Sequence, residues 1–155
     1  MNISAELTAS CSVAELFTWV DDLGQYPQWM GLVHRAEPVE AHDDGLPAWN
    51  VELRARVGPF ARSKRLVMTR TVCQSDIGHE SAEVVFERNE RDGRRHSTWK
   101  LSAKVTALDT GCHLDMQLYY GGGLWTGGLV ERALHDEINA SRGRLISLVS
   151  ETTTQ

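Results

Sequence analysis

The stretch WKLSAKVTALDTGCHLDMQLYY, residues 99–120, alternates apolar and polar side chains in two runs that a turn sequence separates. In a β-strand every second side chain lies on the same face, so each run predicts a strand with one apolar face. The turn sequence Asp109-Thr110-Gly111 lets the second strand fold back antiparallel to the first. The stretch therefore predicts two paired strands, over about 95–108 and 111–120, whose shared apolar face is formed by Trp99, Leu101, Ala103, Val105, Leu114, Met116, Leu118 and Tyr120.

The same period of two extends from this hairpin toward the N-terminus. Trp49, Val51 and Leu53 begin an alternating run over 49–57 that Gly58-Pro59 ends. Further strands are predicted over about 62–74 and 79–89, with turns at residues 76–78 and at Asp92-Gly93, a strong hairpin signal. A weaker strand over about 32–41 and a first strand over 1–9 bring the predicted sheet to about seven strands.

Helical periodicity flanks these strands. From about Trp125 to Val149 apolar residues recur at helical spacing, and about 25 residues of helix would be roughly 37 Å long. Near the N-terminus, Ser12 to Glu15 is a capping-box pattern that predicts a helix over residues 12–20, with Gly24 as its expected end. Residues 25–29 predict a second, short helical turn that contains Pro27.

This order of elements predicts an α+β fold. Consecutive antiparallel strands usually pair with their sequence neighbours, and the apolar face of a twisted sheet must be covered. The long C-terminal helix is the predicted element large enough to cover it. We therefore expect residues 1–155 to form a single domain, in which a curved antiparallel sheet of about seven strands wraps around the C-terminal helix and two short helices follow the first strand.

Composition excludes several classes of protein. With 41% hydrophobic and 24% charged residues the chain is too apolar for disorder, and no apolar run approaches the length of a membrane span. The N-terminus lacks a signal-peptide pattern and the three cysteines form no CxxC or CxxH pair, so we expect a cytoplasmic location and no zinc site. The sequence has no phosphate-binding loop and no GxGxxG, GxSxG or HExxH motif, which predicts neither a cofactor nor a metal.

Charge is distributed unevenly along the chain, whose net charge is −5. Residues 53–104 hold 12 of the 16 Lys and Arg but 6 of the 21 Asp and Glu. A basic segment can attract an acidic ligand or nucleic acid, but here most of its charges occupy alternate strand positions, as on the solvated face of a sheet. Because no nucleic-acid-binding motif accompanies them, we expect no nucleic-acid partner.

The segment DLGQYPQW, residues 22–29, matches a loose D-L-x-x-Y-P-x-W signature. Together with the first helix, the hairpin 99–120 and the C-terminal helix, this signature makes nearly the whole chain resemble the START-like superfamily. That superfamily is also called SRPBCC or helix-grip, and the resemblance is to its polyketide cyclase/dehydrase and lipid-transport group. The resemblance implies a deep cavity between the sheet and the C-terminal helix. It implies no single chemistry, because members include aromatase/cyclases, hydrolases, lipid carriers and hormone receptors.

Candidate ligand-binding residues are those expected to face this cavity. Two arginines, Arg70 and Arg88, share the parity of apolar neighbours and are candidate contacts for an acidic group. Both can instead extend outward to solvent. For strand 62–74 the sequence does not decide which face points inward, because Val67, Thr69 and Cys73 on the opposite face could form the inward face instead. The remaining candidates are Trp49, Val51, Leu53, Met68, Trp99, Leu101, Met116 and Tyr120 on strands, and Trp125, Leu134 and Ile138 on the helix.

Three functions are compatible with these features. The first is binding or transport of a small hydrophobic ligand, lipid-like or aromatic/polyketide-like, in an internal cavity. The second is a cofactor-free polyketide cyclase, aromatase or dehydratase, in which an Arg, Tyr or His polarises a carbonyl group. The third is a protein-interaction module, and a homodimer stays open. The sequence lacks an evident acid–base pair, which favours binding and leaves catalytic residues unassigned.

Overall fold

The computed structural model describes residues 1–76, 80–122 and 128–153. These described residues form seven strands, two α-helices and one 3₁₀ helix, in the order expected. The elements are β1 (Asn2–Ala9), α1 (Val13–Val20), η1 (Leu23–Gln28), β2 (Val33–Val39), β3 (Ala48–Val57), β4 (Phe60–Ser75), β5 (Ser81–Arg88), β6 (Trp99–Leu108), β7 (Gly111–Tyr120) and α2 (Gly128–Thr153).

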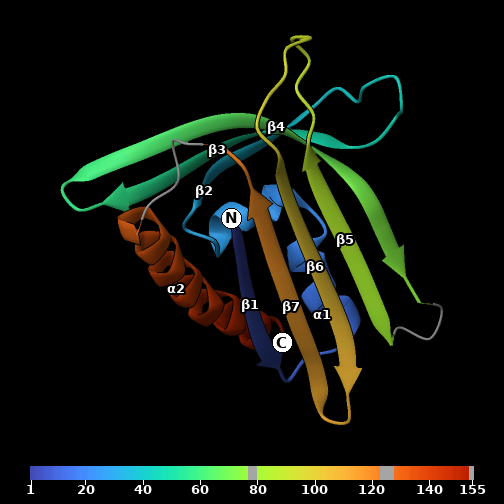
Figure 1. The fold of residues 1–155 in the computed structure, drawn as a ribbon. Coiled ribbons are helices and arrows are strands. Elements are labelled where there is room, and N and C mark those ends of the chain that lie inside the picture. Colours follow the sequence, from blue (N-terminus) through green and yellow to red (C-terminus); the bar gives the residue numbers. More distant parts are fainter. Residues whose placement is uncertain (77–79, 123–127, 154–155) are drawn as a thin grey trace.

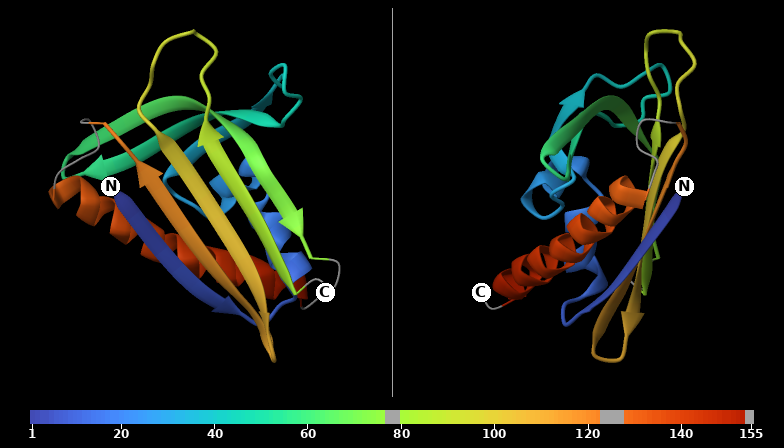
Figure 2. Two further views of the ribbon diagram at one scale, coloured as in Figure 1. Left: turned by 45° about the vertical axis from the view of Figure 1, so that its right-hand side comes forward. Right: turned by 60° about the vertical axis from the view of Figure 1, so that its left-hand side comes forward.

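All seven strands belong to one antiparallel sheet in the order β1-β7-β6-β5-β4-β3-β2. Each strand from β2 to β7 pairs with its neighbour in sequence, and β1 closes the order by pairing with β7. Figures 1 and 2 show the sheet curving so that α1, η1 and α2 all lie on its concave side. The predicted sheet curved around a long C-terminal helix is thereby confirmed.

The chain after β1 folds as two short helices, as expected, but their boundary differs from the prediction. Ser12 caps α1 by accepting a hydrogen bond from the Glu15 amide at 3.2 Å. Gly24 does not end this helix, because α1 stops at Val20 and the Asp22 carboxylate accepts the Gly24 amide at 2.8 Å. That contact makes Asp22 the N-cap of η1 and places Gly24 inside the second helix.

The strands match their predicted positions except at two places. The strand expected over 95–108 begins at Trp99, because residues 89–98 form a loop whose turn uses Gly93 at a φ of 71°. In β4 the pairing with β5 shifts register between Arg70 and Val72, which marks a β-bulge. A bulge reverses the side-chain alternation along a strand, so no single inward parity holds for the whole of β4.

The hydrophobic core fills the concave side of the sheet and has two parts. Beneath α1 and η1, side chains such as Leu16, Val20, Tyr26 and Phe86 have no exposed surface. Beneath α2, which contacts β3 and β1, buried residues recur along one helical stripe formed by Leu134, Ser141, Leu145 and Val149. These two parts of the core differ in how completely they are filled.

Candidate ligand cavity

Two aromatic side chains of the segment 22–29 fix one wall of the site. The last carbonyl groups of a helix have no partner within it, and here side chains supply that partner. The Tyr26 hydroxyl donates to the Val20 carbonyl at 2.8 Å, and the Trp29 indole Nε1 donates to the Trp19 carbonyl at 3.0 Å. With their ring centroids 4.7 Å apart, Tyr26 and Trp29 tie η1 to the end of α1.

Beside this anchor the space between sheet and helices is filled by aromatic rings. Phe86 meets Trp49 edge-on with centroids 5.6 Å apart and Tyr26 with centroids 6.1 Å apart. Edge-to-face packing at these distances is favourable, and none of the three rings is more than 5% exposed. Trp49, a predicted ligand contact, therefore belongs to the solid core.

A cavity lies on the other side of the anchor, between α2 and the strands β1, β3, β4, β6 and β7. The cavity has a volume of about 80 Å³, and the free space between its lining atoms is about 860 Å³ when the part open to solvent is included. Seven of the predicted ligand contacts form part of the wall: Val51, Leu53, Met68, Trp99, Leu101, Met116 and Ile138. Their contact with a ligand stays a prediction.

The wall is apolar and adaptable. Its polar members are Glu6 and Arg142, which are exposed, and Ser141, which is buried. Met30, Met68 and Met116 also line it. An unbranched thioether side chain adopts many shapes at little cost, so these three side chains are the most adaptable part of the wall.

Ser141 places a small side chain in the middle of the buried stripe of α2. The Ser141 hydroxyl donates to the Glu137 carbonyl at 2.6 Å and accepts from the Gly31 amide at 3.3 Å. A Leu or Phe at this position would extend into the cavity that Ser141 lines. Ser141 was not among the residues predicted from the sequence, although its signal is a polar residue that interrupts the apolar spacing between Ile138 and Leu145.

Gly31, also missed, allows α2 to approach the chain that follows η1. A Cβ atom at Gly31 would collide with Oε2 of Glu137 and lie 3.0 Å from Nη1 of Arg144. Arg144 also donates to the Trp29 carbonyl at 3.2 Å. The helix that covers the cavity is therefore held by polar contacts to one short segment, Trp29–Gly31.

Arg70 does not reach the cavity wall. Its guanidinium donates to the Asp21 carbonyl at 2.9 Å and lies over the Trp49 ring, 5.9 Å from the centroid. Burial raises the pKa of the Asp21 carboxyl, and the Arg70 charge opposes that rise. Arg70 therefore contacts the residue that follows α1 and supports the solid core.

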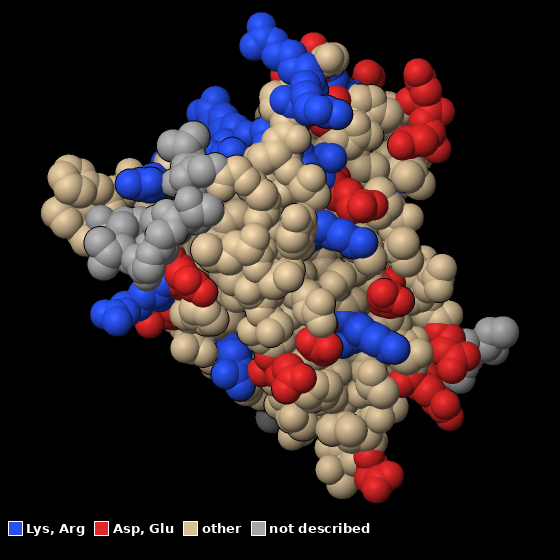
Figure 3. Space-filling view, in the orientation of Figure 1, with Lys and Arg blue, Asp and Glu red and all other residues tan. Residues whose placement is uncertain are grey.

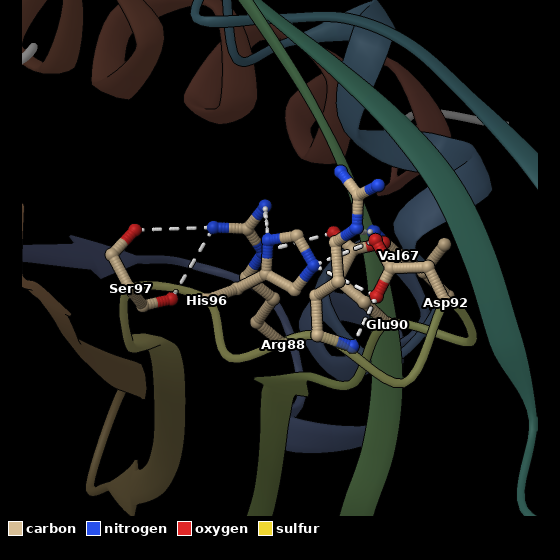
Figure 4. Close-up of polar contacts among 7 residues, drawn as sticks. Val67, Arg88, Glu90, Asp92, His96 and Ser97 are labelled. Atoms are coloured by element: carbon tan, nitrogen blue, oxygen red, sulfur yellow. Dashed lines mark hydrogen bonds and ion pairs between the residues drawn. The ribbon is translucent and has the colours of Figure 1, made fainter.

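Arg88 lies near the cavity but is fully engaged by other groups. Its Nε is 2.9 Å from Glu90 Oε1 and its Nη1 is 3.1 Å from Ser97 Oγ, with the Arg88 side chain only 9% exposed (Figure 4). Glu90 Oε1 also accepts from the Val67 amide at 3.1 Å. In the adjoining loop His96 Nε2 lies 2.8 Å from Asp92 Oδ2. Arg88 therefore anchors the 89–98 loop.

This cluster touches the cavity wall through its neighbours. Arg88 is paired in register with Met68, which lines the cavity. Lys64 Nζ lies 5.9 Å from the centroid of Trp99, another wall residue. Desolvation lowers the pKa of the Lys64 amine, and the nearby Arg88 charge lowers it further. The cationic groups of Arg88 and Lys64 therefore lie directly behind residues of the apolar wall.

The other predicted contacts fall into the core or outside the described residues. Tyr120 is buried, stacks on Trp99 at 4.9 Å and donates its hydroxyl to Met1 Sδ at 2.7 Å. Leu134 is buried in α2 but does not line the cavity. Trp125 lies outside the described residues. Among the residues that are described, no three His, Cys, Asp or Glu side chains gather as metal ligands, and no helix is long and apolar enough to cross a membrane.

Comparisons with known proteins agree on the fold. A START superfamily protein from Mycobacterium smegmatis superposes with a TM-score of 0.68 at 14% identity, over 97% of this chain and 98% of that one. Human StAR-related lipid transfer protein 5 gives 0.77 at 11% identity, over 98% and 76%. An aromatase/cyclase from Streptomyces sp. R1128 gives 0.63 at 9% identity, over 99% and 95%.

No curated protein sequence matches the chain significantly. At these low identities the structural neighbours establish the fold alone. A family model described as "Polyketide cyclase / dehydrase and lipid transport" matches residues 10–144, and this confirms the resemblance inferred from the sequence. By that match the chain belongs to the polyketide cyclase/dehydrase and lipid-transport family, with the helix-grip fold of the START superfamily.

Proposed function

We propose that this protein binds a small hydrophobic molecule, lipid-like or aromatic, in the cavity beneath α2 and acts as a carrier for it. The observation that carries this proposal is the cavity wall, which is apolar and contains three methionines. The small side chain of Ser141 leaves space beside it for a ligand. Burying an apolar ligand there removes apolar surface from water on both sides, which favours binding. The human lipid transfer protein that shares this fold supports the proposal.

The second candidate is a cofactor-free cyclase, aromatase or dehydratase. The family description and the neighbouring aromatase/cyclase support it, together with the cations of Lys64 and Arg88 next to the wall. A carrier is favoured because the polar groups on the described wall form no acid–base pair. Glu6 and Arg142 lie on its exposed side, and the Ser141 hydroxyl is already bonded.

Filling the cavity tests the carrier proposal. A hydrophobic dye such as ANS should bind the folded protein at one site and be displaced by long-chain fatty acids or polycyclic aromatics. Ser141→Phe should weaken dye binding by about tenfold or more, since its ring takes the ligand's space, while overpacking costs about 1–3 kcal/mol of stability. Ser141→Ala, the matched control, removes the hydroxyl and its bond to Gly31 without filling the space, and should weaken dye binding much less than Ser141→Phe does.

Two results would contradict the proposal. One is a folded parent protein that binds neither dye nor displacer. The other is a folded Ser141→Phe, or the smaller Ser141→Leu, that binds with the parent's affinity. The enzyme alternative would be supported if the protein cyclises or dehydrates a bound aromatic polyketide, and if this activity is lost in Arg88→Met but retained in Arg70→Met.

A further inference from the structure

The β3–β4 hairpin has a charge opposite in sign to that of the whole chain. Residues 53–65, here called the basic hairpin, contain Arg54, Arg56, Arg62, Lys64 and Arg65 and no acidic residue, whereas the chain has a net charge of −5. Figure 3 shows Lys and Arg toward the upper left, where Figure 1 shows this hairpin, and also at the top, over the 89–98 loop, while most Asp and Glu lie on the right and below. The basic hairpin is therefore a local positive surface on an acidic protein.

Its cations occupy both faces of the two strands. Arg54 pairs with Ser63 and Arg56 with Ala61, while Arg62 pairs with Ala55 and Lys64 with Leu53. Because Leu53 and Ala55 are buried on the concave face, Arg62 and Lys64 share that face, and Arg54 and Arg56 lie on the convex one. Arg54 is 3.5 Å from Glu52 in an exposed ion pair, which screens only part of this charge. A surface that meets the hairpin end-on is thus met by cations from both sides.

An exposed aromatic ring stands at the tip of the same hairpin. Phe60, the first residue of β4, is 73% exposed, more than any other exposed large hydrophobic residue in the described chain. Its neighbours Gly58 and Pro59 are exposed too, and Gly58 makes the turn at a φ of 62°. A single exposed hydrophobic residue is common on proteins, but a phenyl ring at the tip of a hairpin surrounded by cations is a different arrangement.

We propose that the basic hairpin docks the protein on an anionic lipid surface, with Phe60 inserted among the headgroups and the arginines bound to lipid phosphates. Aromatic and aliphatic side chains enter the headgroup region of a bilayer, and Lys and Arg are drawn to its anionic lipids. The charges on both faces suit a flat surface approached by the tip. A nucleic-acid groove would instead be lined by cations along one face.

Docking there would bring the cavity toward the membrane. Leu53 and Leu66, on the two strands of the hairpin, line the cavity, and Lys64 lies against Trp99, which lines it too. The docking proposal does not depend on the carrier function, because it rests on the charge and exposure of the hairpin alone. If both hold, a lipid-like ligand would move between the bilayer and the cavity along this end of the sheet.

Vesicle flotation tests the proposal. The purified protein should float with vesicles of phosphatidylcholine containing phosphatidylserine, remain unbound with phosphatidylcholine alone, and dissociate as salt is raised. Phe60→Ser and the double change Arg56→Glu/Arg62→Glu should each lower the partition coefficient by about tenfold or more. The matched controls are Leu108→Ser, which removes another exposed apolar side chain, and Arg94→Glu/Arg95→Glu, which makes the same charge change in the 89–98 loop.

Each outcome decides the proposal. Equal binding to both kinds of vesicle, no binding to either, or equal losses in hairpin and control variants would overturn it, as would binding of single-stranded RNA or DNA without vesicle binding. Ser141→Phe separates the two proposals, because a filled cavity should leave flotation unchanged. Circular dichroism spectra and melting temperatures like the parent's establish that the hairpin variants are folded, and the changed residues are exposed.

Discussion

The two halves of the concave face are built from similar strands, but one half is filled by side chains and the other borders a cavity. Under α1 and η1 the space is closed, with Phe86 and Tyr26 completely buried and in edge-on contact. Under α2 the same sheet faces free space that Leu101, Met116 and other apolar side chains line. The strands line both sides with apolar side chains, and on the closed side they also supply two of the packed rings, Trp49 and Phe86.

Another part of the difference lies in the elements that cover the sheet. The short pair α1 and η1 directs large side chains inward, including Tyr26 and Trp29, whose polar atoms bond the end of α1. The longer α2 places Ser141 where a large residue would fill the space, and the Trp29–Gly31 segment contacts it through polar groups. The small side chain of Ser141 therefore leaves space beneath α2 that a large residue would occupy.

The largest expected effect is in the filled half. Phe86→Ala removes a ring packed on two others and should lower the free energy of unfolding by about 3–5 kcal/mol. Leu101→Ala, at the cavity wall, should cost less, about 2 kcal/mol, because its lost contacts already border free space. Urea unfolding of both variants measures the difference. Equal costs would show that the two halves are packed alike.

The repetitive features of this fold could be predicted from the sequence, and the single positions that shape the site could not. Alternation and turn signals together located the seven strands, because a half-buried sheet repeats its pattern along each strand, and the Ser12 cap was found because its partner is three residues away. The β-bulge after Arg70 left no signal in residue type, so the destination of Arg70 stayed open. Contacts between distant segments, such as Gly31 with Ser141, depend on the assembled structure.

The second prediction concerns the contact that holds α2 over the cavity. Gly31→Ala places a Cβ atom against Glu137 and should cost about 1–3 kcal/mol of stability, because either the glutamate side chain or the helix must move. Glu137 Oε2 is buried and has no hydrogen-bond partner among the described residues. The measurement is urea unfolding combined with dye binding, since displacement of α2 would change both.

A double-mutant cycle separates the two ways of relieving the clash. If Glu137 is the obstacle, Glu137→Ala should restore most of the stability lost in Gly31→Ala, and the two changes will be non-additive. If the backbone of α2 must move instead, the losses will add and dye affinity will change with them. Additive losses with unchanged dye binding would disprove the contact as described.

The smallest expected effect is a dependence on pH in the filled half. Cys112 is fully buried, with its Sγ 3.9 Å from that of Cys11 and 3.7 Å from the Ser12 carbonyl. Burial, and then the neighbouring Cys11, raise the pKa of the Cys112 thiol from 9.0 to about 12. The dry surroundings that exclude water from this half are thus expected to keep the thiol neutral in the folded protein.

The sign follows from which state releases its proton first. In the unfolded chain the Cys112 thiol ionises near its ordinary pKa of 9.0, whereas in the folded protein it holds its proton to about 12. The stability it contributes is therefore complete below pH 9 and is lost progressively as pH rises toward 12. Tyr26, whose pKa burial raises far above 10.0, changes stability in the same direction.

Unfolding by urea in the presence of a reductant, at pH 8 to 10.5, measures this loss. Cys112→Ala should be less stable than the parent at pH 8 but lose less stability as the pH rises, because one of the buried groups that titrate is gone. Cys73→Ala, which changes an exposed thiol, should follow the parent curve. Parallel curves for Cys112→Ala and the parent would mean that water reaches this thiol, and that the half beneath α1 is less closed than its packing indicates.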